Sequence, residues 1–215
     1  MAHIGIFDTG KGGEFVAEQL QKLRPEDTCT VVTDKAHLPY GQRSEQQIIE
    51  LTNLAIQPLL SSCDVIVLAC NTATTVAINR LRRLYPGQRF AGFEPMVKTA
   101  ATLTKQNKIA ILATPATLLS PRYQKLKHEW TEGVHVIEPD CSGWATAIEN
   151  DSFKTKTAVD LTRQLVTEGV DVISLACTHY LFLQEAMQQA VGSAAVILSP
   201  LPAVNVQITR LLATA

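Results

Sequence analysis

Two stretches of the chain share one pattern: a run of branched apolar residues that ends in Ala-Cys and continues directly into small polar residues. They span residues 63–72 and 170–179. A continuous apolar run of this length is typical of a parallel strand buried on both faces. The apolar spacing after each run is helical and ends at a glycine. The sequence therefore predicts two units of strand, cysteine and helix, with Cys70 and Cys177 at the strand ends.

The position of these two cysteines suggests that they take part in a reaction. In open parallel sheets, ligands bind beyond the carboxyl ends of the strands, where the next helix presents free N–H groups and the positive end of its dipole. A thiol beside a helix N-terminus has a lowered pKa and is a better base or nucleophile. We therefore expect Cys70 and Cys177 to be reactive and to serve one site formed by two related halves.

Strand and helix signals alternate along the rest of the chain. Short apolar runs predict further strands at residues 3–7, 28–33, 89–93, 108–113, 134–137 and 194–198, with helical spacing between them. This alternation predicts an α/β fold of two pseudo-symmetric, doubly wound parallel-sheet domains with the active site in the cleft between them. Glu94-Pro95 marks the expected crossover. The first domain is then 1–95 plus 200–215, and the second is 96–199.

Several local signals refine this outline. Ser44 and Gln47 form a capping-box pair at the start of a helix, and Pro58 falls near the end of that helix. A glycine-rich loop at residues 8–13 follows the first strand, but it matches neither the dinucleotide fingerprint nor the phosphate-binding loop. Asp8 lies at the carboxyl end of that strand, where either a tight turn or a functional cleft accounts for it equally well.

Composition excludes several classes of function. The formal net charge is −1 with acidic and basic residues mixed, so no basic surface for nucleic acid is expected. No apolar run reaches the roughly 18 residues of a membrane span, and the start of the chain lacks the basic residues of a signal peptide.

The five cysteines are spread without a C-x-x-C pair, which favours free thiols in the cytoplasm over disulfides or zinc. We expect Cys29, Cys63 and Cys141 to be small apolar core residues.

The motifs occur in a characteristic order. They are Ile4-Gly5-Ile6-Phe7-Asp8-Thr9-Gly10, Pro39-Tyr40-Gly41, Cys70-Asn71-Thr72-Ala73, Glu94-Pro95, Thr114 with Thr117, and Cys177-Thr178-His179-Tyr180. Over nearly the whole chain this set resembles the cofactor-independent glutamate racemases of the aspartate/glutamate racemase superfamily. The pair of cysteine motifs, in order and on repeated strand ends, is the most specific part of the resemblance.

The resemblance implies a racemisation that uses two bases and neither a cofactor nor a metal. An acid and a base on opposite faces of Cα would exchange the α-proton. By analogy with the family, Cys70 acts on one face with help from Asp8, and Cys177 acts on the other with help from His179. Glu149 lies about where the family carries a further acidic residue. The product would be D-glutamate for peptidoglycan.

The resemblance also implies a substrate site rich in hydroxyl and amide groups, which suits the two carboxylates of glutamate. The matching residues are Thr9, Tyr40, Gly41, Asn71, Thr72, Thr114, Thr117 and Thr178. Taken singly, Asn71, Thr72, Thr114 and Thr117 could equally be helix caps. Members of the family are often dimers, so a homodimer is expected, although no stripe of the sequence identifies an interface.

Other functions remain open from sequence. The chain could be a racemase for aspartate or another amino acid, or a decarboxylase or isomerase of the same superfamily. It could be a catalytically weak homologue that acts through a protein partner such as DNA gyrase, although the intact cysteines argue against this. A cysteine hydrolase using Cys177 and His179 is disfavoured, because those side chains need not converge and no third orienting group is evident. Departures from the family at Thr9, Glu14 and the shortened segment 140–155 bear on turnover and substrate preference.

Overall fold

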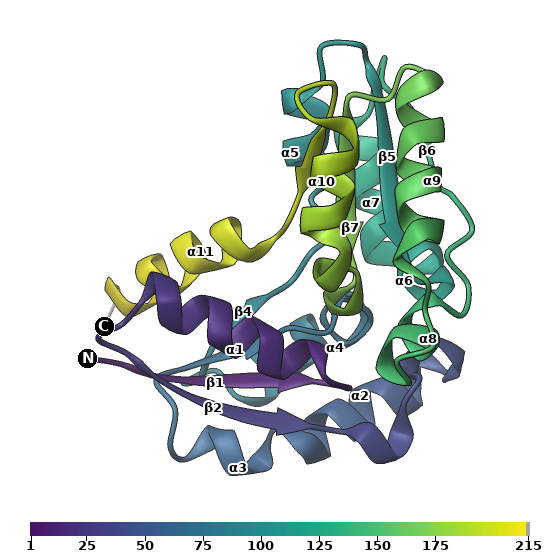
Figure 1. Ribbon diagram of the computed structural model, residues 1–215. Helices are drawn as coiled ribbons and strands as arrows, with labels where there is room; N and C mark the ends of the chain where they lie inside the picture. Colours follow the sequence, from purple (N-terminus) through teal and green to yellow (C-terminus); the bar gives the residue numbers. More distant parts are fainter. Residues whose placement is uncertain (214–215) are drawn as a thin grey trace. The chain divides into compact units, whose positions relative to one another are not determined.

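The computed structural model describes residues 1–213 and forms two compact units, each built on a four-stranded parallel sheet with flanking helices (Figure 1). The first unit contains residues 1–94 and the described part of the C-terminal segment from Leu201, and the second contains residues 95–200. The predicted α/β fold with two parallel sheets is confirmed.

The first unit has the strand order β2-β1-β3-β4. Its strands are β1 (His3–Asp8), β2 (Thr28–Thr33), β3 (Val65–Leu68) and β4 (Arg89–Gly92). Its helices are α1 (Gly12–Leu23), α2 (Glu45–Ala55), α3 (Gln57–Leu60), α4 (Asn71–Leu84) and α11 (Leu201–Ala213), with short 3₁₀ segments η1 (Lys35–His37) and η2 (Tyr40–Gln42). The C-terminal helix α11 packs against α1 and β4, so the chain returns to its first unit at the end.

The second unit repeats this topology with the order β6-β5-β7-β8. Its strands are β5 (Lys108–Ala113), β6 (His135–Ile137), β7 (Val172–Ala176) and β8 (Val196–Leu198). Its helices are α5 (Val97–Leu103), α6 (Pro115–Leu119), α7 (Pro121–Trp130), α8 (Trp144–Glu149), α9 (Thr155–Thr167) and α10 (Gln184–Val191), with the 3₁₀ helix η3 (Thr178–Leu183) before α10.

The two strands that end at a cysteine are central in their sheets. β3 pairs with β1 and β4, and β7 pairs with β5 and β8, all in parallel. Every residue of β3 and of β7 is buried, as expected for strands covered by helices on both faces. The apolar runs that precede Cys70 and Cys177 therefore lie at the centre of each sheet.

Local signals account for several helix boundaries. The capping box of Ser44 and Gln47 is confirmed at the start of α2, where the side chain of each residue bonds the backbone N–H of the other. Pro58 does not kink α2, which ends earlier, at Ala55; the proline lies in the first turn of α3 instead.

Helix α6 begins directly after β5, because Thr114 caps it and Pro115 is favourable in a first helical turn. One expectation about the second unit is wrong. The helix expected directly after the second cysteine motif begins as the 3₁₀ helix η3, and α-helical geometry starts only at Gln184.

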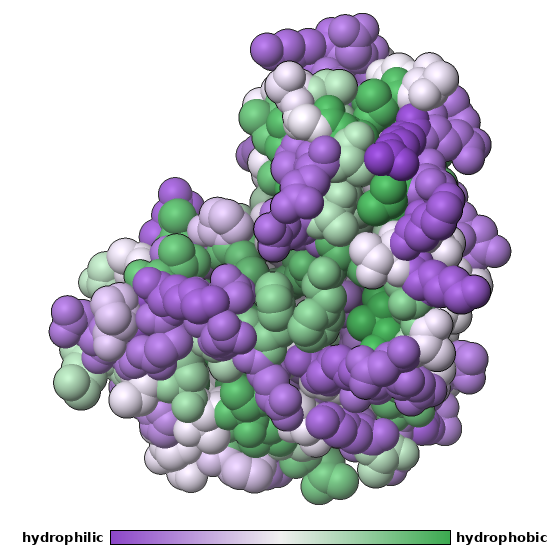
Figure 2. All heavy atoms as spheres, in the orientation of Figure 1, coloured by the Kyte–Doolittle hydropathy of each residue, from purple (hydrophilic) through white to green (hydrophobic). Residues whose placement is uncertain are grey.

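The surface mixes polar and apolar side chains in small groups, as Figure 2 shows for one face. Among the described residues, no helix combines the length and the apolar character needed to cross a bilayer.

Helix α4 crosses β4 closely at Gly92. A Cβ atom at this glycine would lie 2.5 Å from Cγ2 of Thr74 and 2.8 Å from Cδ1 of Ile78. Thr74 has little freedom to move, because its hydroxyl donates to the carbonyl oxygens of Leu68 (2.8 Å) and Cys70 (2.9 Å). The absent side chain thus allows the helix that follows the first cysteine to lie directly on the sheet.

We expect Gly92→Ala to lower the free energy of unfolding by about 1–3 kcal/mol, because the added methyl group overpacks the helix–sheet contact. The matched control is Gly87→Ala, where a new Cβ meets no atom within 4 Å and stability should be unchanged within about 0.5 kcal/mol. Urea unfolding followed by circular dichroism compares the three proteins. Equal stability of the two variants would contradict the close crossing.

Candidate active site

In the first unit, strand pairing brings Asp8, Thr9 and Cys70 to one edge of the sheet. β1 and β3 are neighbours, and the N–H of Ala69 donates to the carbonyl of Phe7 at 2.8 Å, so the two strands end side by side. Asp8 is fully buried, and its Oδ1 accepts from the N–H of Gly10 at 2.9 Å. The Thr9 hydroxyl donates to Sγ of Cys70 at 3.7 Å.

The start of α1 passes close to this cluster. A Cβ atom at Gly13 would lie only 2.7 Å from Cβ of Asp8. Glycine is therefore required where the helix backbone approaches the buried carboxylate. The glycine-rich loop serves this approach, and Glu14, the next residue, is exposed and pairs with Lys35 at 3.7 Å.

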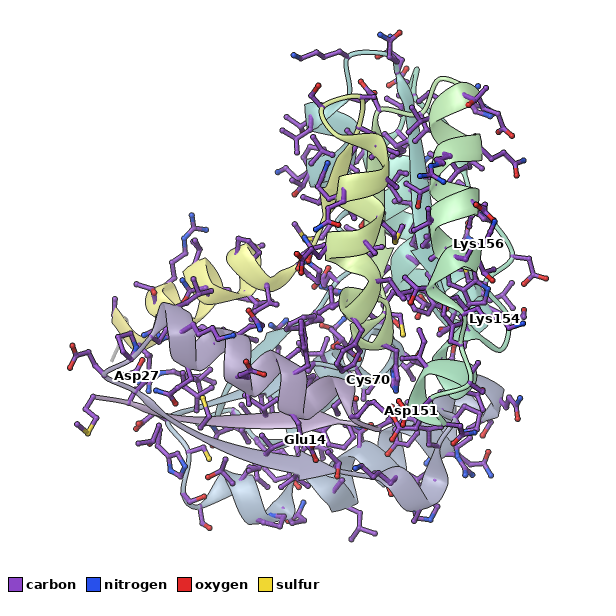
Figure 3. All side chains as sticks on the ribbon, in the orientation of Figure 1. Glu14, Asp27, Cys70, Asp151, Lys154 and Lys156 are labelled. Atoms are coloured by element: carbon purple, nitrogen blue, oxygen red, sulfur yellow. The ribbon has the colours of Figure 1, made fainter. Side chains whose placement is uncertain are left out.

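Cys70, labelled in Figure 3, immediately precedes α4, as expected, but the expected depression of its pKa is wrong. Burial, and then the negative charge of Asp8, raise the pKa of the thiol to about 12. The N–H groups of Ala73 and Thr72 and the Thr9 hydroxyl act in the opposite direction and are outweighed. The helix N-terminus does favour the thiolate, but a desolvated site next to a carboxylate disfavours it more strongly.

Asn71, the first residue of α4, is 3% exposed. Neither its amide nitrogen nor its amide oxygen has a hydrogen-bond partner within residues 1–213. The helix-cap alternative is therefore wrong for Asn71. A buried amide without partners costs about 1–3 kcal/mol, so this side chain indicates a site for a polar ligand. Its neighbour Thr72 is also buried.

Tyr40 is held by a carboxylate that the sequence argument missed. Its hydroxyl donates to Oδ2 of Asp34 at 2.7 Å, and Nδ1 of His37 lies 2.7 Å from Oδ1 of the same residue. Burial, and then Asp34, raise the pKa of Tyr40. Asp34 follows β2 as Asp8 ends β1, and its N–H donates to the carbonyl of Asp8 at 3.1 Å. An acidic residue directly after a strand was the signal that could have identified it. Gly41 follows Tyr40 in η2 and is half-buried.

In the second unit, Cys177, His179 and Glu149 form a chain of contacts. Sγ of Cys177 lies 3.9 Å from Nδ1 of His179, and Nε2 of the same ring lies 2.8 Å from Oε2 of Glu149. Cys177 and His179 are buried, at 8% and 3% exposure. The expectation that the cysteine and histidine need not converge is wrong, because the 3₁₀ turn of η3, with the N–H of Tyr180 donating to the carbonyl of Cys177 at 3.0 Å, brings them together.

The contact with Glu149 orients the histidine ring. The 2.8 Å contact between Nε2 of His179 and Oε2 of Glu149 fixes the direction of the ring. Nδ1 of His179 then faces the sulfur, where it can accept the thiol proton or, once protonated, return it. This arrangement is a cysteine with a base and an orienting carboxylate, which cysteine hydrolases also use.

The remaining threonines lie at the same edge of the second sheet. Thr114 follows β5 and Thr178 follows Cys177 after β7, and these strands are paired neighbours. The hydroxyls of Thr114 and Thr117 are 3.0 Å apart, and Thr114 accepts from the N–H of Thr117, so for Thr114 the capping alternative holds. Thr117 and Thr178 are buried.

None of the five cysteines, all of which lie within the described residues, forms a disulfide. Cys63 and Cys141 are buried, as expected for core positions, whereas Cys29 is only half-buried, because it lies in the edge strand β2. Burial, and then Asp140, raise the pKa of Cys141 to about 12. In the part of the chain that the structure describes, no three His, Cys, Asp or Glu side chains form a group that could hold a metal ion.

Comparison with known proteins gives one consistent result. Residues 14–206 match the model of the Asp/Glu/hydantoin racemase family. A glutamate racemase of Roseiflexus sp. is 35% identical over 97% of this chain and 78% of its own length, and one of Ectopseudomonas mendocina is 35% identical over 98% and 82%. The crystal structure of a glutamate racemase isoform from Bacillus anthracis matches with a TM-score of 0.83 and 26% identity, over 99% of this chain and 82% of that one.

The electrostatics of Cys70 give a test of the first cluster. We expect Asp8→Asn to lower the pKa of the Cys70 thiol from about 12, while burial keeps it above its ordinary value of 9.0. At pH 9, alkylation of Cys70 by iodoacetamide should accelerate about tenfold for each unit by which the pKa falls. Mass spectrometry of the peptide that contains Cys70 measures the rate of alkylation. The control is Glu14→Gln, which removes an exposed carboxylate in helix α1 and should leave the alkylation rate of Cys70 unchanged. An unaltered rate in Asp8→Asn would show that its charge does not act on the thiol.

Proposed function

The chain belongs to the Asp/Glu/hydantoin racemase family, and we propose that it is a glutamate racemase that interconverts L- and D-glutamate without a cofactor. The observation that carries this proposal is the repeated strand end, at which each unit presents one buried cysteine with its own acid–base partner. A reaction that inverts a carbon centre needs two such groups, whereas a hydrolase needs one. The D-glutamate formed serves peptidoglycan synthesis.

The reaction begins with a weakly acidic bond. Without an electron sink such as pyridoxal phosphate, the α-proton of an amino acid can be removed only by a strong, well-placed base. We assign this role to the thiolates of Cys70 and Cys177, one for each face of Cα. One thiolate removes the proton while the thiol of the other delivers a proton to the opposite face, and the next turnover in reverse restores the first state.

The two thiols receive different assistance. Asp8 raises the basicity of Cys70 through its negative charge, so that the thiolate, once formed, is a strong base toward carbon. Cys177 exchanges its proton with Nδ1 of His179, and Glu149 stabilises the imidazolium that results. The raised pKa of Cys70 favours a neutral thiol in the first unit.

Substrate binding is assigned to the hydroxyl, amide and backbone groups at both sheet edges. The residues are Thr9, Tyr40, Gly41, Asn71 and Thr72 in the first unit and Thr114, Thr117 and Thr178 in the second. The N-terminus of α4 adds free N–H groups suited to a carboxylate. Glutamate exceeds aspartate by one methylene, which is worth about 1–3 kcal/mol in a pocket, so some activity on aspartate is compatible with this assignment.

The cellular setting is also part of the proposal. Five cysteines without a disulfide suit a reducing compartment, which supports the cytoplasm. The family resemblance supports a homodimer. Neither assignment affects the chemistry within each unit.

Exchange of the α-proton in D₂O tests the function directly. We expect the protein to invert glutamate and incorporate deuterium at Cα, and we expect Cys70→Ser or Cys177→Ser to reduce inversion at least about 10³-fold, because each removes one of the two bases. NMR measures exchange and circular dichroism measures inversion, with L- and D-aspartate assayed in parallel. Cys63→Ser is the matched control, since this buried cysteine precedes β3 and should be dispensable. Faster turnover of aspartate, or full inversion by either active-site variant, would overturn the assignment.

The unpartnered amide of Asn71 gives a second, independent test. Asn71→Leu replaces the buried amide with an apolar side chain of similar shape. We therefore expect the free energy of unfolding to stay the same or rise by about 1 kcal/mol. Glutamate should no longer raise the melting temperature of this variant, because the amide that binds it is lost.

The control is Thr74→Val, which is also buried in α4 but loses two hydrogen bonds and should destabilise the protein by about 1–2 kcal/mol. Differential scanning calorimetry with and without glutamate measures both effects. A clear loss of stability in Asn71→Leu with intact glutamate binding would assign the residue to the fold instead.

A further inference from the structure

Helix α8 carries Glu149 but is itself a short element. It has six residues and lies between two residues with positive φ, Gly143 at 77° and Asp151 at 55°; Figure 3 labels Asp151 just beyond its end. A helix of this length has little stability of its own. The position of Glu149 therefore depends on what holds α8 in place.

Two contacts join α8 to η3, one at each end of the helix. At its C-terminal end, Glu149 bonds His179. At its N-terminal end, the ring of Trp144 packs edge-on against the ring of Tyr180, with centroids 5.6 Å apart and planes at 64°. His179 and Tyr180 are consecutive residues of η3. The aromatic contact therefore fixes the segment that contains the histidine to the helix that contains its carboxylate.

Further contacts hold the aromatic ring of Trp144 from both sides. Phe153 packs on it with centroids 4.8 Å apart, and the N–H of Phe153 donates to Ala147 within α8 at 3.1 Å. Tyr180 is fully buried, and its hydroxyl donates to the carbonyl of Cys141 at 3.2 Å, on the loop that leads into α8. The N–H of Trp144 donates to that same carbonyl at 3.2 Å. Trp144 is thus the residue at which these contacts meet.

We propose that Trp144 is a positioning residue for the racemisation: its packing on Tyr180 and Phe153 holds α8 against η3 and thereby keeps the Glu149 carboxylate on Nε2 of His179. The proposal rests on the proposed function, in which His179 exchanges the proton of Cys177. Trp144 lies about 7.5 Å along the helix from Glu149, so it acts on the chemistry through the carboxylate.

The consequence concerns one of the two bases. Without the aromatic contact, Glu149 no longer fixes the ring, and Nδ1 of His179 is less often aimed at the sulfur of Cys177. Proton transfer at this thiol then slows, while the Cys70 side is untouched. Because the equilibrium constant of a racemisation is one, kcat/KM must fall equally in both directions. The two directions differ instead in which thiol breaks the Cα–H bond.

The kinetic experiment compares Trp144→Ala, Trp144→Phe, Glu149→Gln and the double variant Trp144→Ala/Glu149→Gln. We expect Trp144→Ala to lower kcat about 10- to 100-fold with KM nearly unchanged, and Trp144→Phe to restore most of it, because the geometry and not the binding is lost. The double variant should be no slower than Glu149→Gln alone, since the two residues act in one chain. With α-deuterated substrate, Trp144→Ala and Glu149→Gln should each raise the kinetic isotope effect in only one of the two directions of the racemisation. This direction should be the same for both variants.

An activity-independent measurement accompanies the kinetics. In ¹⁵N-labelled protein, the low-field ring N–H proton of His179, assigned with His179→Asn, reports the bond to Glu149. We expect this signal in the wild type and in Trp144→Phe and its loss in Trp144→Ala. Trp130→Ala, which removes the chain's other tryptophan from α7, is the matched control and should change neither the signal nor kcat.

The outcomes separate this inference from the proposed function. If Glu149→Gln leaves kcat unchanged, the assigned role of Glu149 fails, and the NMR signal still decides whether Trp144 holds the contact. Retention of the signal and of kcat in Trp144→Ala would overturn the inference, as would full additivity of the two substitutions. If Trp144→Ala does not fold, Trp144→Leu keeps the apolar volume without the ring geometry and is read in the same way.

Discussion

The hydrogen-bonded register of the two central parallel strands in each sheet sets the positions of the groups that lie at the ends of these strands. In the first unit, Phe7 is paired with Leu68, so that Asp8, the last residue of β1, and Ala69, which follows β3, lie at the same end of the sheet, and Cys70 comes next. In the second unit, Ala113 is paired with Ala176, and the chain delivers Thr114 and Cys177 to one edge in the same way. A shift of one residue in either pairing would turn the side chains to the other face. The chemistry is therefore fixed by main-chain bonds deep in the core.

The two units use this common geometry to create unlike environments. Cys70 has a buried carboxylate for a neighbour, which disfavours its thiolate, whereas Cys177 has an imidazole, which can accept its proton. The backbone frame is repeated, while the titratable neighbours of the two thiols differ. The proposed two-base reaction can use this difference, because each thiol has its own group with which to exchange or retain a proton.

Much of this arrangement could be predicted because it depends on local pattern and on the rules of parallel sheets. Buried strands read as apolar runs, and residues directly after them lie at the ligand-binding edge, which located Asp8, Cys70 and Cys177. The sign of the Cys70 pKa shift could not be predicted, because desolvation depends on everything that packs around the thiol. Trp144 was missed for a related reason, because it packs against Tyr180, which is distant in the chain, and it lies in no motif. Asp34 contacts the nearby residues His37 and Tyr40, and its place directly after a strand was the signal that was overlooked. The convergence of Cys177 and His179 depends on a 3₁₀ turn that apolar spacing does not distinguish from an α-helix.

The groups at these strand ends are ones that a fold selected for stability alone would avoid. A fully buried aspartate and a buried amide whose atoms have no hydrogen-bond partner among the described residues each cost free energy. Asp8 ends β1 and Asn71 follows β3, two strands in which every residue except His3 is buried, so the neighbouring core supplies the stability that the site lacks. Such local conflicts are expected where a site must bind and deprotonate a ligand. The unfavourable terms and the chemistry coincide because the same desolvation that penalises these groups strengthens their interaction with a charged substrate.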